Sequence, residues 1–231
     1  MAATMRQCAA RTSPPPAEGG TDIYHLRVWL RGISPMIWRR LLLRGDHTLA
    51  DLHYVLHITF GWSDEHLHRF ALHGREYGIP RLGGPWYTGD ARDVRLADLG
   101  LRPRERFFYE YDVTDNWRHD IRVERIGPPD GAMCYPLCGA GKRAGPPEDC
   151  GGPEAYLEQR QRYALAYVAR RIATILDADT NLEAIAACRA EVVTAEPWLD
   201  VDRFDRRAIN RRLQQYAVGD GCWREDIVLS D

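Results

Sequence analysis

Side chains that can do chemistry gather in the middle of the chain. Residues 107–126 are predicted to form two strands around a polar turn, and residues 134–152 are too rich in glycine and proline for regular structure. Together these segments hold aspartates, a histidine, the acidic pair Glu148-Asp149 and three cysteines. Such side chains act in general acid–base chemistry or bind metal ions. We therefore expect any chemical centre of this protein to include residues of this region.

The cysteine loop predicts a zinc site. Cys134 and Cys138 have three residues between them, and Cys150 follows after eleven more. The C-x3-C spacing is compatible with zinc, and the glycines of the loop would let it fold back toward Cys150. His119 would complete a Cys3His set if its strand reaches the loop. The alternative is three unligated thiols in a loop held by prolines and hydrogen bonds.

A second set of residues is predicted to act as acids and bases or to hold a divalent cation: His66, His68, Asp112, Asp115 and His119. His66 and His68 are two residues apart, so a strand would place them on one side, and an H-x-H pair suits zinc, manganese or iron. Asp112 shares a predicted strand face with Glu110, and both could line a groove with His119. The alternatives are hydrogen-bonded structural histidines and a β-turn at Asp115-Asn116.

Two further histidines, His53 and His57, lie one helical turn apart, which is also compatible with a metal. His53 borders the apolar stripe of its predicted helix, so we expect it at the edge of the core. His57 is expected to face solvent.

Ligand-binding candidates come from aromatic and basic residues. Trp86 and Tyr87 lie in a Gly-Pro loop and could stack on a ligand, whereas Trp117 is a further candidate whose simpler interpretation is core packing. Arg207 and Arg211 belong to a basic face of the last predicted helix that could contact phosphate or an acidic partner. The alternative is a solvated face balanced by neighbouring aspartates.

Composition bounds these interpretations. The chain has 231 residues, 45% of them hydrophobic and 28% charged, as in ordinary globular proteins. A formal net charge of −2 argues against a broad electrostatic footprint for nucleic acid, although a local basic patch is compatible with it. The chain has no run of eighteen apolar residues, so no membrane span is predicted. The first twenty residues lack the apolar core of a secretory signal. We expect a cytoplasmic protein without a membrane partner.

The elements that must position these residues form an α+β pattern. Residues 22–33 alternate apolar and polar side chains, as expected for a strand, and a second strand follows the turn at Ser34-Pro35. Thr48 and Asp51 predict a capping box at the start of a helix that packs on the sheet. Later helices are expected at 153–176, 182–193 and 202–218. We predict an antiparallel or mixed sheet with a packed helix near the N-terminus and a helical C-terminal region. The predicted domain spans 22–218, between tails at 1–21 and 219–231.

The order of the motifs SPMIWRRLLLRG, FYEYDVTDNWRHDI, YPLC, PPEDCGG and WLDVDRFDRRAIN resembles the plasmid pRiA4b ORF-3-like family over residues 22–213. Related TnpR-like passenger proteins of bacterial insertion elements share this pattern. The resemblance implies an architecture and an association with plasmids or mobile elements, but no activity. The chain departs from the family pattern at Thr114, where relatives have a glycine, and at Gly145, where they often have a cysteine.

Three functions remain open at this point. The first is a binding or accessory protein without enzymatic activity, because no complete nucleophile triad, phosphate loop or dinucleotide fingerprint is visible. The second is a metal-dependent hydrolase or nuclease that uses the His/Asp set. The third is a nucleic-acid-binding protein that uses the arginine helix.

Overall fold

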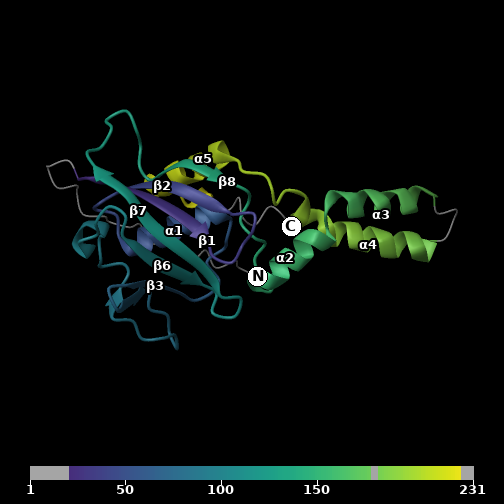
Figure 1. The fold of residues 1–231 in the computed structure, drawn as a ribbon, viewed down its shortest axis with the longest axis horizontal. Coiled ribbons are helices and arrows are strands. Elements are labelled where there is room, and N and C mark those ends of the chain that lie inside the picture. Colours follow the sequence, from purple (N-terminus) through teal and green to yellow (C-terminus); the bar gives the residue numbers. More distant parts are fainter. Residues whose placement is uncertain (1–20, 178–181, 225–231) are drawn as a thin grey trace, which may run out of the picture.

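Alternating apolar residues build the centre of one eight-stranded sheet (Figure 1). β1 (Ile23–Leu30) pairs antiparallel with β2 (Trp38–Arg44) on one side and with β7 (Trp117–Gly127) on the other. Leu26, Val28 and Leu30 of β1 are fully buried on one face. The computed structural model describes residues 21–177 and 182–224, so almost all of the predicted N-terminal tail lies outside the described residues.

The strand order is β5-β4-β3-β6-β7-β1-β2-β8. The remaining strands are β3 (His68–Leu72), β4 (Arg75–Gly78), β5 (Gly89–Asp90), β6 (Arg106–Tyr111) and β8 (Leu137–Lys142). β4 and β5 pair in parallel and the other described pairs are antiparallel, so the predicted mixed sheet is confirmed.

β8 corrects one expectation, because it lies inside the glycine-rich segment predicted to be irregular. It pairs with β2 at the edge of the sheet. The glycines there serve close packing: a Cβ on Gly141 would lie 2.5 Å from the ring of Phe204. Tertiary context thus overrides the low strand propensity of glycine.

Helix α1 (Leu49–Phe60) begins at the predicted capping box. The backbone N–H of Asp51 donates to the Thr48 hydroxyl at 3.1 Å, and the Thr48 N–H donates to the Asp51 carboxylate at 2.8 Å. Its apolar stripe packs on the sheet and forms the core. His57 is fully buried, so the expectation that it faces solvent is wrong. Two rings from later in the chain contact its imidazole edge-on: Trp62, just after α1, and Tyr111, at the end of β6.

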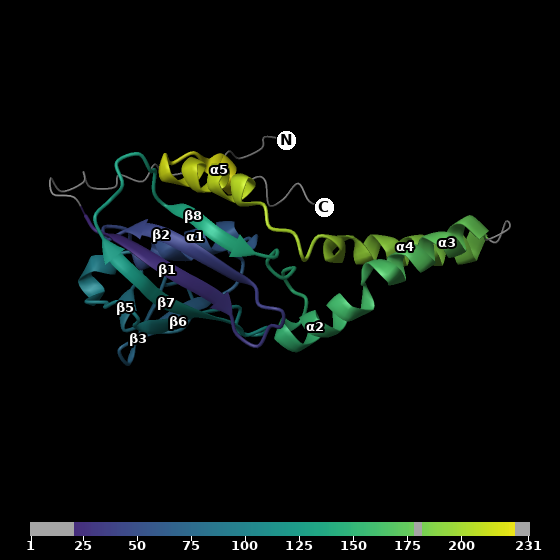
Figure 2. The ribbon, with the colours of Figure 1, turned by 45° about the horizontal axis from the view of Figure 1, so that its top comes forward.

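The C-terminal region consists of α2 (Gly152–Arg162), α3 (Leu165–Asp177), α4 (Leu182–Leu199) and α5 (Arg206–Ala217). The helix predicted over 153–176 is interrupted at Tyr163, whose ring stacks on Trp198 with 6.0 Å between ring centroids. α5 begins later than predicted because the Asp205 carboxylate caps it, accepting from the Ala208 N–H at 2.9 Å. α3 and α4 form a hairpin that projects away from the sheet (Figures 1 and 2). No described helix has both the length and the apolarity to cross a membrane.

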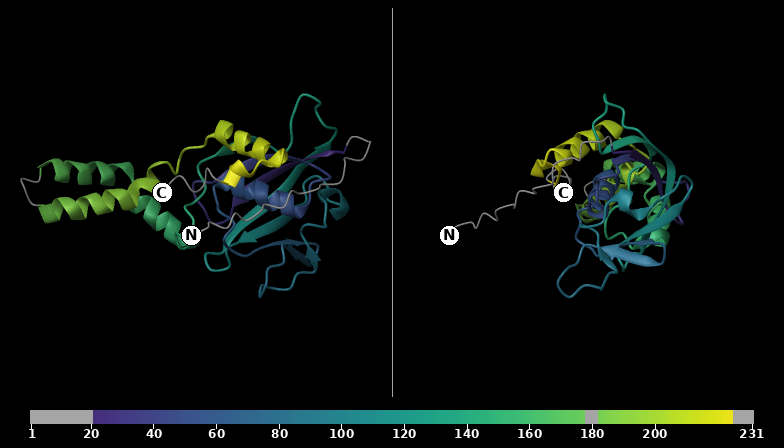
Figure 3. Two further views of the ribbon diagram at one scale, coloured as in Figure 1. Left: turned by 180° about the vertical axis from the view of Figure 1, so that it is seen from behind. Right: turned by 90° about the vertical axis from the view of Figure 1, so that its left-hand side faces the viewer.

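α5 covers the free edge of β8 (Figure 2). The side-chain amide of Asn210 accepts from the Cys138 N–H at 2.8 Å and donates to the Cys138 carbonyl at 3.0 Å, as a neighbouring strand would. α5 also contacts α1, and both helices lie on the same side of the sheet (Figure 3). A short 3-10 helix, Gly221–Arg224, follows within the predicted C-terminal tail, and its Trp223 is buried against Tyr54 and Tyr216.

Candidate functional site

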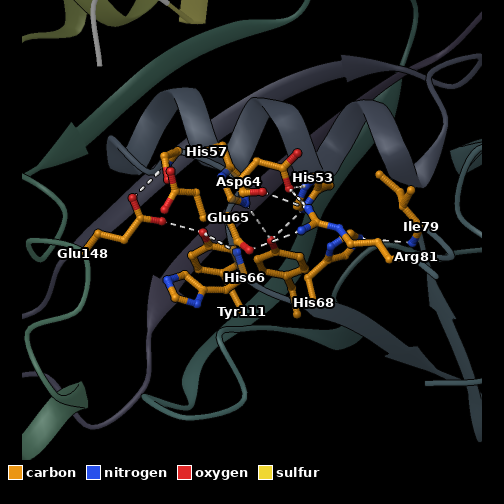
Figure 4. Close-up of polar contacts among 12 residues, drawn as sticks. His53, His57, Asp64, Glu65, His66, His68, Ile79, Arg81, Tyr111 and Glu148 are labelled. Carbon is orange, nitrogen blue, oxygen red and sulfur yellow. Dashed lines mark hydrogen bonds and ion pairs between the residues drawn. The ribbon is translucent and has the colours of Figure 1, made fainter. Parts of the chain in front are cut away.

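A chain of hydrogen bonds crosses the core beneath α1 (Figure 4). The Tyr109 hydroxyl lies 3.1 Å from His57 Nε2 and 2.8 Å from His53 Nδ1, and His53 Nε2 lies 2.9 Å from Asp64 Oδ1. Burial lowers the pKa of both histidines well below its usual value, so both imidazoles are neutral. The protonation pattern that satisfies the chain has His57 donating to Tyr109, Tyr109 to His53, and His53 to Asp64.

We call the hydrogen-bonded residues His57, Tyr109, His53 and Asp64 the inner chain. Arg81 binds its last member, Asp64. Its guanidinium donates to Asp64 Oδ1 at 2.6 Å and to the Asp64 carbonyl at 2.9 Å. His68 stacks on His53 with ring centroids 3.7 Å apart, and its Nε2 accepts from the Ile79 N–H at 3.3 Å. Burial lowers the pKa of His68 to about 4. The inner chain therefore uses neutral histidines to hold residues 61–67 in place. We call these residues, which connect α1 to β3, the return segment.

His53, His57 and Asp64 have the spacing of a metal site, but apart from His57 Nδ1 their ring nitrogens and the Asp64 Oδ1 atom already have partners. Both ring nitrogens of His53 have hydrogen-bond partners, and Asp64 already accepts from the Arg81 cation. A metal ion would have to displace a guanidinium and break a buried hydrogen-bond chain. These contacts favour a structural role for the inner chain.

A second group, the outer triad of His66, Asp112 and Asp149, lies at the surface. His66 Nδ1 lies 3.7 Å from Asp112 Oδ2, and His66 Nε2 lies 3.0 Å from Asp149 Oδ1. One ligand atom from each residue lies within 4.8 Å of the other two. Asp112 is buried and its Oδ1 accepts from the Thr114 N–H at 2.9 Å, whereas Asp149 is exposed. The outer triad can bind a cation or move protons at its open side.

The loop that carries Asp149 is fixed by contacts with the return segment. The Tyr111 hydroxyl donates to Glu148 at 2.5 Å, and the other Glu148 oxygen accepts from the Ser63 N–H at 2.9 Å (Figure 4). Burial and the Glu148 carboxylate raise the pKa of Tyr111. A Cβ on Gly145 would lie 1.9 Å from the Phe60 carbonyl oxygen, so this close approach requires glycine. The loop can therefore present Asp149 beside His66.

The structure brings together only part of the predicted His/Asp set. His66 and Asp112 are adjacent, but His68 faces the core and Asp115 instead accepts from the Gly151 N–H at 2.9 Å. The histidines of the H-x-H pair are separated because His66 precedes β3 and only His68 is part of it. Asp149 joins His66 only through folding, and the acidic pair in the loop was its one sequence signal.

His119 does not line a groove with the carboxylates, so that expectation is wrong. It lies opposite Tyr109 in the β6–β7 register, and directly opposed residues share a sheet face. Glu110 is on the other face, where it pairs with Arg69. His119 is fully buried, with its ring 4.7 Å from that of Phe60, and burial lowers its pKa to about 3. Asp112 follows the end of β6 with a left-handed φ of 57°, which removes it from the strand alternation.

The cysteines are not gathered with His119 into a ligand group. Cys138 is buried in β8 with its thiol 3.6 Å from the Ala140 carbonyl, Cys150 is half-buried and Cys134 is exposed. Burial raises the pKa of Cys138 to about 11 and that of Cys150 to about 12, so both thiols are protonated at neutral pH when no metal is bound. Among the described residues, the groups of three potential ligands contain no cysteine. Zinc binding by this loop stays a prediction.

The aromatic candidates have different environments. Trp117 is buried in the core, as its alternative interpretation predicted. The Tyr87 hydroxyl donates to the His68 carbonyl at 2.7 Å, and its ring occupies the space beside Gly78. Trp86 is 98% exposed. Of this pair, only Trp86 has a ring free to stack on a ligand.

The arginines of α5 divide into two groups. Arg206 donates to the Gly139 carbonyl at 2.9 Å and Arg212 to the Trp223 carbonyl at 2.9 Å, so both support the fold. Arg207 and Arg211 line a shallow groove of about 900 Å³ between β8 and α5. These two are the arginines through which an anionic partner could be bound.

Comparisons with known proteins identify relatives of this chain. The family described as Plasmid pRiA4b ORF-3-like protein matches residues 22–166. An uncharacterized protein of Sinorhizobium fredii, y4hQ, is 35% identical over 143 residues, which cover 59% of this chain and 71% of that protein. The crystal structure of a protein of unknown function from Methanosarcina mazei Go1, MM3350, superposes with a TM-score of 0.62 at 28% identity. The match covers 82% of this chain and 98% of that one.

Proposed function

This chain belongs to the plasmid pRiA4b ORF-3-like family, and the relatives described above have no assigned activity. From the site itself we propose that the protein is a binding protein that holds a divalent metal ion at the outer triad. One observation carries the proposal. An imidazole and two carboxylates from three separate segments, at His66, Asp112 and Asp149, lie within 4.8 Å of one another.

The donor chemistry supports a borderline transition metal. One imidazole nitrogen and two carboxylate oxygens suit zinc, manganese or iron, whereas calcium prefers oxygen ligands alone. Within the described part of the chain, neither Asp112 nor Asp149 forms an ion pair with an arginine, in contrast to Asp64. Two uncompensated carboxylates beside one imidazole attract a divalent cation.

A metal-dependent hydrolase is the second candidate, and the openness of the outer triad favours it. The Asp149 side chain is 69% exposed and that of His66 is 28% exposed. A metal bound there would keep positions for water or substrate, which is the arrangement of catalytic rather than structural sites. Such a metal would lower the pKa of its bound water, and this would supply a nucleophile near neutral pH.

Calorimetric titration of untagged protein with Zn²⁺ and with Mn²⁺ tests the proposal. We expect one equivalent to bind, and His66→Ala and Asp112→Asn to weaken binding by at least about tenfold, the scale seen when even supporting residues of metal sites are removed. His73→Ala is the matched control, because His73 is an exposed histidine paired with Glu105 away from the triad.

The alternatives give different results. Loss of binding in a Cys134→Ser/Cys150→Ser variant, with His66→Ala unaffected, would assign the metal to the cysteine loop instead. No binding of either ion would overturn both. Turnover of a phosphodiester by the metal-loaded protein, absent in His66→Ala, would select the hydrolase over the binding protein.

Two further predictions concern mobile elements and nucleic acid. The plasmid-derived name of the family agrees with an accessory role linked to plasmids or mobile elements. Binding of nucleic acid through α5 rests on Arg207 and Arg211 alone. The other residues of the groove are uncharged, except Arg206, which already donates a hydrogen bond to the Gly139 carbonyl. Both stay predictions.

A further inference from the structure

No described α-helix covers one face of the sheet. α1 and α5 lie in front of the sheet when the molecule is seen from behind (Figure 3), whereas in Figure 1 the strands themselves face the viewer. In β1, the side chains on this open face alternate with the buried Leu26, Val28 and Leu30 and are partly exposed. The open face therefore presents four adjacent strands, β2, β1, β7 and β6, to the surroundings.

Four arginines form a row across the open face. Arg27 of β1 lies opposite Arg40 of β2 on one side and opposite Arg122 of β7 on the other. Arg122 in turn lies opposite Arg106 of β6. Directly opposed residues share a face, so the four side chains, which we call the arginine row, stand side by side. With neighbouring strands ~4.8 Å apart, the row spans about 14 Å.

The protein neutralises only one end of the arginine row. Arg40 donates to both carboxylate oxygens of Glu124, at 2.6 and 3.1 Å. Among the described residues, no carboxylate forms an ion pair with Arg27, Arg106 or Arg122, so the row keeps a formal charge of +3. The Nε atom of Arg122 is shielded from solvent and has no hydrogen-bond partner there. Like charges directly opposite one another destabilise a sheet, so an anion on this row would relieve a cost that the protein itself leaves uncompensated.

An aromatic row runs parallel to the arginine row, two residues further along each strand and therefore ~7 Å away. Trp29 lies opposite Trp38 on one side and opposite Asp120 on the other, and Asp120 lies opposite Phe108. The three rings, which we call the aromatic row, are partly exposed. Asp120 pairs with Arg118 at 3.8 Å, so it does not neutralise the arginine row.

The two rows contact each other through stacked side chains. The guanidinium carbon of Arg27 lies 5.0 Å from the centre of the Trp38 ring, and that of Arg106 lies 5.7 Å from the centre of the Trp29 ring. Stacking on a ring orients a guanidinium group but uses none of its N–H donors. The stacked arginines are therefore held in position with donors still available for phosphate oxygens.

We propose that the open face binds a single strand of nucleic acid, with phosphates along the arginine row and bases over the aromatic row. A single strand has a regular line of charges beside a line of flat rings, and the two parallel rows match both. At one phosphate per ~3.4 Å, about four phosphates would lie along the arginine row. Unpaired bases stack on aromatic rings and guanidinium planes of open sheets, whereas the bases of a duplex are stacked inside it. An acidic peptide would match the charges but not the rings.

Fluorescence anisotropy with a labelled oligothymidylate, with EDTA present so that the outer triad holds no metal, tests the proposal independently of the metal site. We expect binding that weakens steeply between about 50 and 200 mM salt. Arg27→Gln/Arg122→Gln should weaken binding at least about tenfold at low salt. It should also lower the salt slope by about 1.4, since each lost phosphate contact contributes about 0.7. Arg207→Gln/Arg211→Gln removes the same charge from the α5 groove and is the matched control, with an expected change within about twofold.

Two further measurements separate binding from a purely structural role. Trp29→Leu keeps an apolar residue on β1 but removes the stacking ring, so it should weaken oligonucleotide binding at least about fivefold with unchanged circular dichroism. Arg27→Gln/Arg122→Gln removes two opposed charges, so its urea midpoint at low salt should equal or exceed that of the wild type.

Four outcomes would overturn the proposal. The first is no binding of the oligothymidylate at low salt, and the second is an equal loss of binding in the α5 control. The third is equally tight binding of a duplex or of polyglutamate, which would mean that the rings make no contribution. The fourth is a lower urea midpoint for Arg27→Gln/Arg122→Gln, which would assign the arginine row to packing on the tryptophans.

Discussion

The inner chain and the outer triad are built from the same residue types but differ in what surrounds them. In the inner chain, His53 has partners on both ring nitrogens and Asp64 is paired with Arg81. In the outer triad, His66 lies between Asp112 and Asp149, and no arginine compensates either carboxylate within the described residues. The distances between potential ligand atoms do not distinguish the two groups, since both groups have them close enough to share a metal ion. The two groups differ in their hydrogen-bond partners and in the charges beside them.

The two groups are also coupled through the backbone between them. Asp64, the end of the inner chain, and His66, the centre of the outer triad, are two residues apart. Arg81 donates to the carbonyls of both Asp64 and Glu65, at 2.9 and 3.3 Å. The buried group thus orients the exposed one, a division of labour in which rigidity of the support sets the geometry of the site.

The largest expected effect is acid sensitivity, which arises at the buried histidines of the inner chain, His53 and His57, and at His68 and His119 beside it. Burial lowers the pKa of His68 to about 4 and that of His119 to about 3, from 6.5, and also lowers those of His53 and His57. Below about pH 6.5 the unfolded chain binds more protons than the folded one, so stability is lost as pH falls. Each such histidine should reduce the free energy of unfolding by about 1.4 kcal/mol per pH unit until its folded pKa is reached.

Urea unfolding at a series of pH values from 7.5 to 5 measures this loss. Below about pH 6.5, we expect His119→Gln to reduce the slope by about 1.4 kcal/mol per pH unit. A free energy of unfolding that is constant over this range would contradict the neutral, buried state of the histidines.

A smaller effect should follow from Tyr109→Phe, which keeps the ring and removes the hydroxyl at the centre of the inner chain. The change leaves His53 Nδ1 and His57 Nε2 without a partner in the core, so we expect a loss of about 1–3 kcal/mol in the free energy of unfolding. Tyr87→Phe is the matched control, because its hydroxyl makes one bond at a half-buried position. Equal losses in the two variants would mean that the inner chain is no stronger than an ordinary tyrosine contact.

The smallest effect is expected for His66→Ala in metal-free protein, within about 0.5 kcal/mol, as for most surface changes. Adding Zn²⁺ at about 100 times the wild-type dissociation constant should then stabilise the wild type by about 2.7 kcal/mol and the variant by at most about 1.4 kcal/mol, because its binding is at least about tenfold weaker. Thermal or urea unfolding with and without metal checks both values. A large metal-free loss would place His66 with the inner chain as a structural residue.

Local sequence signals predicted those elements that depend on neighbouring residues alone. The capping box at Thr48 and Asp51, the alternation of β1 and the strands around the Asp112–Asn116 turn all follow from spacing along the chain. The helix break at Tyr163 and the strand β8 did not, because each depends on a distant partner, Trp198 in one case and β2 in the other.

The sequence by itself determined the α+β class, the family, and the conclusion that histidines and carboxylates are the groups able to do chemistry. Only the tertiary structure decided which of them meet. His57 is buried because the rings of Trp62 and Tyr111 cover it. His119 faces the core because it is in register with Tyr109. Asp149 lies beside His66 because Glu148, the preceding residue, is hydrogen-bonded to Tyr111. Spacing along a chain fixes which face of an element a residue occupies. What that face meets depends on packing between segments that are distant in sequence.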